Sequence, residues 1–197
     1  MAAGDRAAAR ARATIRSLYD PTSSRANDFV HEVDVTRPWT TGYAMARPLR
    51  HGLGLNDTDG LDVSPWVGLS DVSASSNGIQ GFVSVRRGRC GLVLGGPRLG
   101  MLSSRFAQAR ALGRALVRPE QQNFILSVAR GHDERVAGAF AAELLAPAEG
   151  IRQSLYAIGK HDDSALEAVA RHFKVSPLLV RHQYDNQIAV SSHKAIW

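Results

Sequence analysis

The chain has 197 residues, a formal net charge of +6, and 44% hydrophobic and 21% charged residues. This length fits one ordinary domain with an appendage, and the composition excludes a chain that is disordered throughout. No apolar run approaches the ~18 residues of a membrane span, and residues 1–20 lack the apolar segment of a signal peptide. The single cysteine, Cys90, excludes an internal disulfide. We therefore expect a cytoplasmic protein with no membrane association.

The first third of the chain predicts little regular structure. Residues 1–18 can form a helix but have a weak apolar stripe, and residues 19–40 have the composition of a loop-rich connector. Apolar residues recur at helical spacing over residues 43–55, where Pro48 interrupts the pattern. Residues 61–69 contain Pro65 and Trp66, and their sequence does not predict one type of secondary structure.

Two short strands are expected next, over residues 79–85 and 90–94. They flank an Arg-Arg-Gly-Arg segment in which Gly88 can adopt the positive φ of a tight turn, so they predict a β-hairpin. Cys90 lies within the second strand, which favours a structural thiol over a nucleophile. Residues 95–100 form a glycine-rich loop, but no Gly-Lys-Ser/Thr follows, so it is not a phosphate-binding P-loop.

Two helices should form the centre of the chain. The first is capped by Ser103 or Ser104 and ends near Arg118, before a proline. Residues 120–130 fit a strand or a loop. The second helix covers residues 133–145 and ends at Pro147.

Residues 151–156 and 164–186 are expected to be helical, and the second stretch has a helix-turn-helix pattern. Four small or apolar residues occupy the positions that pack two such helices together: Ala170, Phe173, Val175 and Val180. Lys174 stands at the turn position usually given to glycine. As a DNA reader, this pair would present Ser176, Arg181 and His182 to the major groove. A purely structural role is favoured, because the second helix has one firm cation and phosphate contacts dominate DNA affinity.

The two central helices together resemble the metal-binding helices of the ImmA/IrrE family of bacterial metallo-endopeptidases. Residues 105–114 read Arg-Phe-Ala-Gln-Ala-Arg-Ala-Leu-Gly-Arg, where family members typically read Arg-Phe-x-x-Ala-His-Glu-Leu-Gly-His. Residues 134–147 read Glu-Arg-Val-Ala-Gly-Ala-Phe-Ala-Ala-Glu-Leu-Leu-Ala-Pro, where the family commonly reads Glu-x-x-Ala-Asn-x-Phe-Ala-Ala-x-Leu-Leu-Met-Pro. The resemblance extends over roughly residues 42–187.

The residues that carry the zinc chemistry of the family are largely missing. The two histidines fall on Arg110 and Arg114, the catalytic glutamate falls on Ala111, and only the third zinc ligand is kept, as Glu134. Arginine has no acceptor lone pair and stays protonated, and a lone carboxylate does not hold zinc. The Asn of the second motif is replaced by Gly138. We therefore expect no catalytic residue, no metal and no cofactor.

The resemblance implies an α+β fold. It consists of a zincin-like core, with a small sheet, the HExxH-type helix and the glutamate helix, followed by a helix-turn-helix-like subdomain. The expected divisions are residues 1–40 for the tail and connector, 41–150 for the core and 151–197 for the helical subdomain. The seven histidines are scattered, and each is interpreted as a surface or capping residue. Phe140, Leu144 and Leu145 are interpreted as core, and Glu143 as a solvated position.

Positive charge is concentrated near the vacated zinc site. Residues 72–119 contain eight arginines and no acidic residue. Six of the arginines in and around this site are candidates for binding an anion or an acidic partner: Arg86, Arg87, Arg89, Arg110, Arg114 and Arg118. The alternative is a solvated face on which the arginine stems lie along apolar surface. Both interpretations remain open at this stage.

The expected function is partner binding rather than hydrolysis. A family member without zinc could retain the groove that engages a helix-turn-helix repressor and act in bacterial or phage gene regulation, stress response or defence. A DNA-binding regulator and a component of a toxin–antitoxin module are the alternatives. Because an unpaired buried carboxylate is costly, we also predict that Glu134 forms a salt bridge with Arg110, Arg114 or both, in place of the metal.

Overall fold

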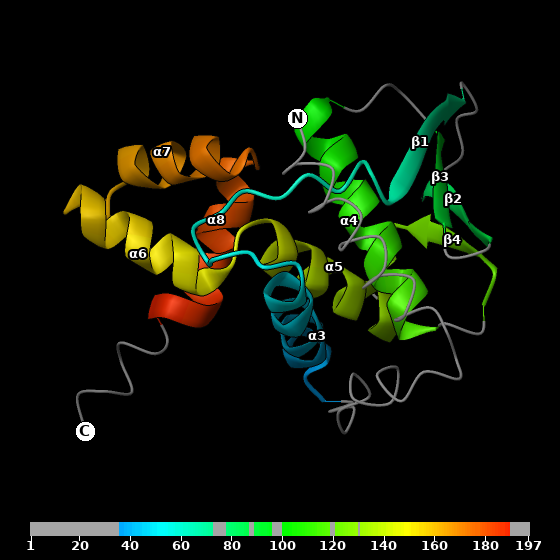
Figure 1. Ribbon diagram of the computed structural model, residues 1–197, viewed down its shortest axis with the longest axis horizontal. Helices are drawn as coiled ribbons and strands as arrows, with labels where there is room; N and C mark the ends of the chain where they lie inside the picture. The colour runs from blue at the N-terminus through cyan, green and yellow to red at the C-terminus, as the bar shows by residue number, and fades with distance from the viewer. Residues whose placement is uncertain are drawn as a thin grey trace.

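The computed structural model describes residues 36–72, 78–86, 89–95, 100–118, 121–129 and 131–189. These residues form an α+β fold in which a four-stranded sheet lies at one end and helices make up the rest (Figure 1). The α+β class expected from the sequence is confirmed. The expected helix over residues 1–18 and most of the connector lie outside the described residues.

The sheet has the strand order β1-β3-β2-β4. Strands β2 (Ile79–Arg86) and β3 (Arg89–Gly95) pair antiparallel as the expected hairpin, and Phe82 lies opposite Val93. The ambiguous segment contributes the edge strand β1 (Val67–Val72), which runs parallel to β3. The other edge is β4 (Asn123–Ser127), antiparallel to β2. One face of the sheet is buried, because side chains such as Val83, Leu92 and Leu126 are at most 1% exposed.

Three helices pack together beside the buried face of the sheet. These are α3 (Pro38–Gly52), α4 (Met101–Val117) and α5 (His132–Leu145), with α5 in contact with both of the others. Glycine permits both close contacts: a Cβ at Gly113 of α4 would lie 2.7 Å from the Phe140 ring, and one at Gly42 of α3 would collide with the backbone of α5. Phe140, Leu144 and Leu145 are buried, as expected.

The C-terminal helices lie on the side of α5 that faces away from the sheet (Figure 1). They are α6 (Ala148–Ile158), α7 (Asp163–Phe173), α8 (Pro177–Gln183) and a π-helical turn, η1 (Tyr184–Ala189). The turn between α7 and α8 places Lys174 at a φ of 53°, the left-handed conformation that usually favours glycine. The four residues expected to pack α7 on α8 are all buried: Ala170, Phe173, Val175 and Val180.

Two largely buried arginines connect distant segments through backbone carbonyls. Arg50 of α3 donates to Leu144 O at 2.7 Å and to two carbonyls of the following loop. Arg105, one of the residues that match the family motif, donates to the carbonyls of Leu61, Phe173 and Lys174. Arg105 therefore attaches the α7–α8 turn to α4. Hydrogen bonds of a charged donor are stronger than neutral ones, so these contacts hold the C-terminal helices against the core.

Several expected details differ from the structure. Helix α4 begins two residues before Ser103 with Gly100 as its N-cap, and no side chain caps it, so the expected serine cap is wrong. The expected divisions after residues 40 and 150 fall inside α3 and α6. Among the described residues, no helix has the length and apolar character to cross a membrane.

Candidate functional site

The three positions that would hold a metal in the family motif meet where α4 crosses the start of α5. Arg110 projects from α4 and hydrogen-bonds the carboxylate of Glu134. The same guanidinium donates to the Gln80 side chain from β2 and to Ser127 O from β4 at 3.0 Å. Both partners of the ion pair have side chains only 11% exposed. The predicted salt bridge is therefore present, and it connects both central helices to the sheet.

Arg114, one turn further along α4, contributes less to this pair. Its Nε lies 3.9 Å from Glu134 Oε1, which is within ion-pair range but too long for a hydrogen bond. Its main partner is Asp133, at 2.7 Å, and its guanidinium also lies 5.4 Å from the centre of the Phe124 ring. Asp133 and Glu134 are adjacent on α5, and adjacent residues of a helix point in different directions. This difference in direction allows Asp133 to pair with Arg114 while Glu134 pairs with Arg110.

Asp133 also accepts a bond from Arg118 at 3.2 Å, and His132 lies 3.4 Å from its other oxygen. Burial acts to raise the pKa of Asp133, but hydrogen bonds from Arg118 and His132 and the charges of the two arginines outweigh it. The pKa of Asp133 is therefore lower than its ordinary value. Three arginines face two carboxylates in this cluster, which we call the arginine–carboxylate cluster: Arg110, Arg114, Arg118, Asp133 and Glu134.

The donor set of the cluster does not suit a metal ion. Guanidinium groups provide no lone pair, and both carboxylates are engaged by arginine. Ala111, at the position of the catalytic glutamate, is fully buried and has no polar side chain. Within the described part of the chain, no group of three or more His, Cys, Asp or Glu residues could hold a metal ion. The residues at this position therefore do not fit the zinc that the resemblance implies.

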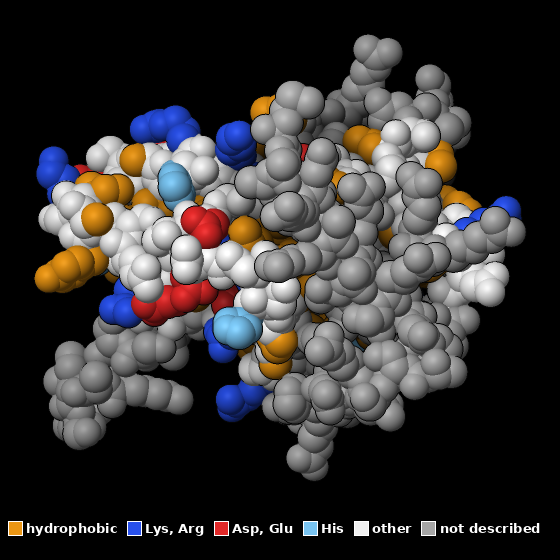
Figure 2. All heavy atoms as spheres, viewed as in Figure 1, with side chains coloured by type: hydrophobic (Ala, Val, Ile, Leu, Met, Phe, Trp, Pro, Cys, Tyr) orange, Lys and Arg blue, Asp and Glu red, His pale blue; other side chains and the backbone are white. Residues whose placement is uncertain are grey.

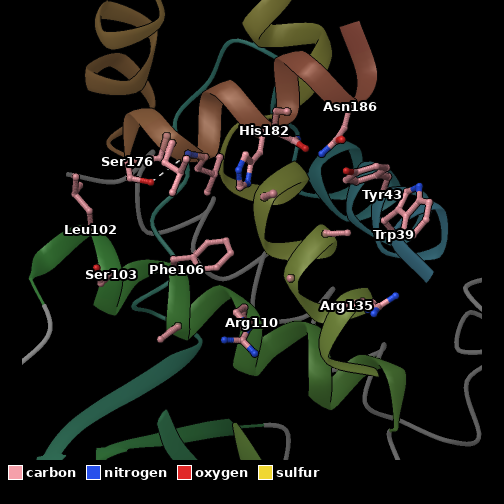
Figure 3. Close-up of a pocket in the computed structure, with 18 of the residues that line it drawn as sticks. Trp39, Tyr43, Leu102, Ser103, Phe106, Arg110, Arg135, Ser176, His182 and Asn186 are labelled. Atoms are coloured by element: carbon pink, nitrogen blue, oxygen red, sulfur yellow. Dashed lines mark hydrogen bonds between the residues drawn. The ribbon is translucent and has the colours of Figure 1, made fainter. Parts of the chain in front are cut away.

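A cleft of about 670 Å³ opens beside Arg110. Figure 3 shows its walls: Leu102, Phe106 and Arg110 from α4, Trp39 and Tyr43 from α3, and His182 and Asn186 from α8 and η1. One face of α5 completes it with residues spaced three or four apart, namely Arg135, Gly138, Ala139 and Ala142. The described part of the lining contains two arginines and a histidine but no carboxylate. The cleft is therefore mostly apolar, with positive charge where α4 and α5 cross.

Glu143, expected to be solvated, is instead 2% exposed, so that interpretation is wrong. Its carboxylate accepts from Arg47 Nε at 2.8 Å and from Gln183 and Gln187, each at 2.9 Å. It also accepts from the backbone N–H of Ala148, at the start of α6. Glu143 thus joins α3, α6, α8 and η1 to α5, and it fixes Gln183 in the wall of the cleft.

The other predicted binding residues lie apart. Arg86 is exposed at the end of β2 and is not among the residues that line the cleft, whereas Arg118 is paired with Asp133. Nothing is described of the side chains of Arg87 and Arg89. Of the three possible DNA contacts, Ser176 caps α8 and Arg181 pairs with Asp163 at 2.6 Å. The third, His182, lines the cleft. Acidic and basic side chains both lie over the C-terminal helices in Figure 2.

The structure agrees with the interpretation of the cysteine and of four histidines, but not with that of His132 as a surface or capping residue. Cys90 is buried in β3, and burial raises the pKa of its thiol to about 12, as expected for a structural cysteine. His51, His161, His172 and His182 are exposed, and His132 is half-buried. The remaining histidines, His31 and His193, lie outside the described residues.

No protein-family model matches the chain, and no curated protein matches it. The resemblance to the ImmA/IrrE family therefore rests on the residues of the two central helices.

Proposed function

We propose that this chain is a catalytically inactive, ImmA/IrrE-like protein that acts by binding a protein partner. The partner we propose is a helix-turn-helix repressor, in bacterial or phage gene regulation or in a stress or defence response. The scaffold is a zincin-like core in which an ion pair takes the place of the metal, followed by a helix-turn-helix-like subdomain.

The observation that carries the proposal is the pair formed by Arg110 and Glu134. Zinc in peptidases joins the HExxH helix to the glutamate helix, and the two residues here join the same two positions of the motif. A structural metal contributes folding free energy directly, and a buried ion pair with further hydrogen bonds can maintain the same helix crossing without one. The chain lacks the metal ligands but retains the contact between the two helices. This combination fits a protein that binds a partner through its surface and does not hydrolyse it.

The cleft supports binding rather than another kind of catalysis. Among its described lining residues, Ser176 caps α8, and no hydrogen bond joins Ser103 or Ser176 to His182, so no pair of nucleophile and oriented base is assembled there. Its apolar walls and its width are suited to side chains of a partner segment. DNA binding is less well supported, because Arg181 is neutralised by Asp163 and α8 has seven residues.

The test uses purified helix-turn-helix repressors, beginning with any that is encoded next to the gene for this chain. Calorimetric titration in the presence of a chelator should give a measurable dissociation constant, and mass spectrometry should show an intact repressor even after zinc is added. The Gly138→Leu variant should weaken binding, because its side chain would project into the cleft from a position where a Cβ meets no atom within 4 Å. Cleavage of the repressor, or binding to duplex DNA without binding to the repressor, would contradict the proposal.

A further inference from the structure

We infer that the cleft between α3, α4, α5 and α8 is a binding site for a small amphipathic anion, meaning a free molecule with an apolar body and a carboxylate or sulfonate group. This inference goes beyond the proposed function, because it concerns a small molecule and requires no protein partner. Three features support it: the volume of the cleft, the position of its arginines on α4 and α5, and the absence of carboxylates among its described lining residues.

The cleft has the dimensions of a ligand pocket. Its volume of about 670 Å³ lies within the range of roughly 300 to 1,000 Å³ found for small-molecule sites. The width comes from α5, where the residues facing the cleft after Arg135 are Gly138, Ala139 and Ala142. Since a Cβ at Gly138 would meet no atom within 4 Å, this part of the helix leaves open space that larger side chains would occupy.

The two arginines of the lining come from α4 and α5, whereas apolar side chains together with Ser176 and His182 form the α8 wall. Phe106 lies between α4 and α8 in Figure 3, and Val175 and Leu179 also line the cleft, so these side chains offer an apolar surface to the body of a ligand. Arg110 and Arg135 lie at the end where α4 and α5 cross, since Arg110 bonds Glu134, the neighbour of Arg135. An amphipathic ligand would therefore place its charged group at this end.

Among the described residues, the charged side chains that line the cleft are arginines. Arg110 is already neutralised by Glu134, but Arg135 is exposed and has no carboxylate partner among the described residues. In the part of the chain that the structure describes, no aspartate or glutamate lines the cleft. Tyr43 adds a neutral donor at the α3 wall: burial and the charge of Glu143 raise its pKa despite Arg47, so the phenol stays protonated. A concave surface of this kind attracts anions and offers no favourable partner to a cation.

The experiment compares two fluorescent probes that differ in charge. The first, 1-anilinonaphthalene-8-sulfonate, has an aromatic body and an anionic group, and the second, N-phenyl-1-naphthylamine, has the same aromatic body without the sulfonate. The full-length protein should bind the sulfonate at one site, at least about tenfold more tightly than the neutral probe, and added salt should weaken only the sulfonate. Dodecanoate should displace the sulfonate probe, and dodecanol should not.

Two variants test whether the sulfonate probe binds in this cleft. Gly138→Leu should abolish binding of the sulfonate, whereas Ala157→Leu, which adds the same side chain at an exposed position of α6, should not change it. Arg135→Gln should weaken binding about fivefold, the upper range for an exposed charge pair. Arg171→Gln, which removes an exposed charge from α7, is its control. A cooperative thermal transition in each variant excludes probe binding to a partly folded state.

Equal affinity for both probes, or unchanged sulfonate binding in Gly138→Leu, would overturn the inference. Failure of the proposed function is separate, since it appears as loss of repressor binding while the sulfonate still binds. Repressor binding without sulfonate binding would remove this inference and leave the proposed function in place.

Discussion

The ion pair between Arg110 and Glu134 predicts a specific loss of stability when its charge is removed. Glu134→Gln keeps the size of the side chain and one oxygen acceptor but removes the negative charge that faces Arg110. Arg110 would keep Gln80 and Ser127 O as neutral acceptors, and Arg114 would keep Asp133. We therefore expect a cost below the 3–5 kcal/mol found when a fully buried pair is broken, at about 2 to 3 kcal/mol.

The measurement is urea unfolding followed by circular dichroism, with the midpoint expected to fall and the slope to remain unchanged. For a chain of this size, the expected loss corresponds to a decrease in Tm of roughly 5 to 10 °C. Glu167→Gln is the matched control, because Glu167 is 59% exposed and lies 4.0 Å from Arg171. It should cost less than about 0.5 kcal/mol. Glu143→Gln cannot serve as the control, since Glu143 is buried.

A double-mutant cycle with Arg110→Met separates the pair from the rest of the cluster. We expect a coupling free energy of about 1 to 3 kcal/mol between the two positions. If Glu134→Gln and Glu167→Gln had equal effects, or if the cycle gave no coupling, the reasoning would be refuted.

Four further outcomes are expected. The purified protein should contain no stoichiometric zinc, and a chelator should not lower its Tm; one zinc per chain, removed with loss of stability, would contradict this. The pKa of Asp133 is lower in the folded protein than in the unfolded chain, so the free energy of unfolding should decrease as the pH drops below about 4. In Asp133→Asn, the urea midpoint should depend less on acid pH than in the unchanged protein. Glu143→Gln should lower the free energy of unfolding by about 2 kcal/mol or more, because it removes a charge that accepts four hydrogen bonds. A loss within about 0.5 kcal/mol, as for a surface substitution, would be inconsistent with the buried network. Arg181→Ala should leave gel-shift affinity for duplex DNA unchanged, and a folded variant that lost sequence-specific binding would show that α8 reads DNA.

The sequence predicted those parts of the fold that depend on local pattern. The hairpin of β2 and β3 follows from alternating strands around a turn, and the α7–α8 pair follows from four apolar residues at fixed spacing. Strand β1 was ambiguous because Pro65 and Trp66 precede it and its pairing with β3 is parallel, which no turn signal marks.

The site was predicted in part. The pairing of Arg110 with Glu134 followed from the motif and from the cost of an unpaired carboxylate. The roles of Gln80 and Asp133 depend on contacts with other segments of the chain, and a single sequence gives no signal for them. For Glu143, the available signal was its spacing of three residues from Phe140 and seven from Val136, which places it on the buried face of α5.

The most direct test of the account is to restore two ligands at the vacated site. The variant with Arg110→His and Arg114→His would present two imidazoles one turn apart on α4, facing Glu134 on α5. The account predicts that this variant binds one zinc per chain and that a chelator lowers its Tm, whereas the unchanged protein shows neither property. A folded variant that binds no zinc would contradict the claim that the arginine–carboxylate cluster occupies the position of a zinc site.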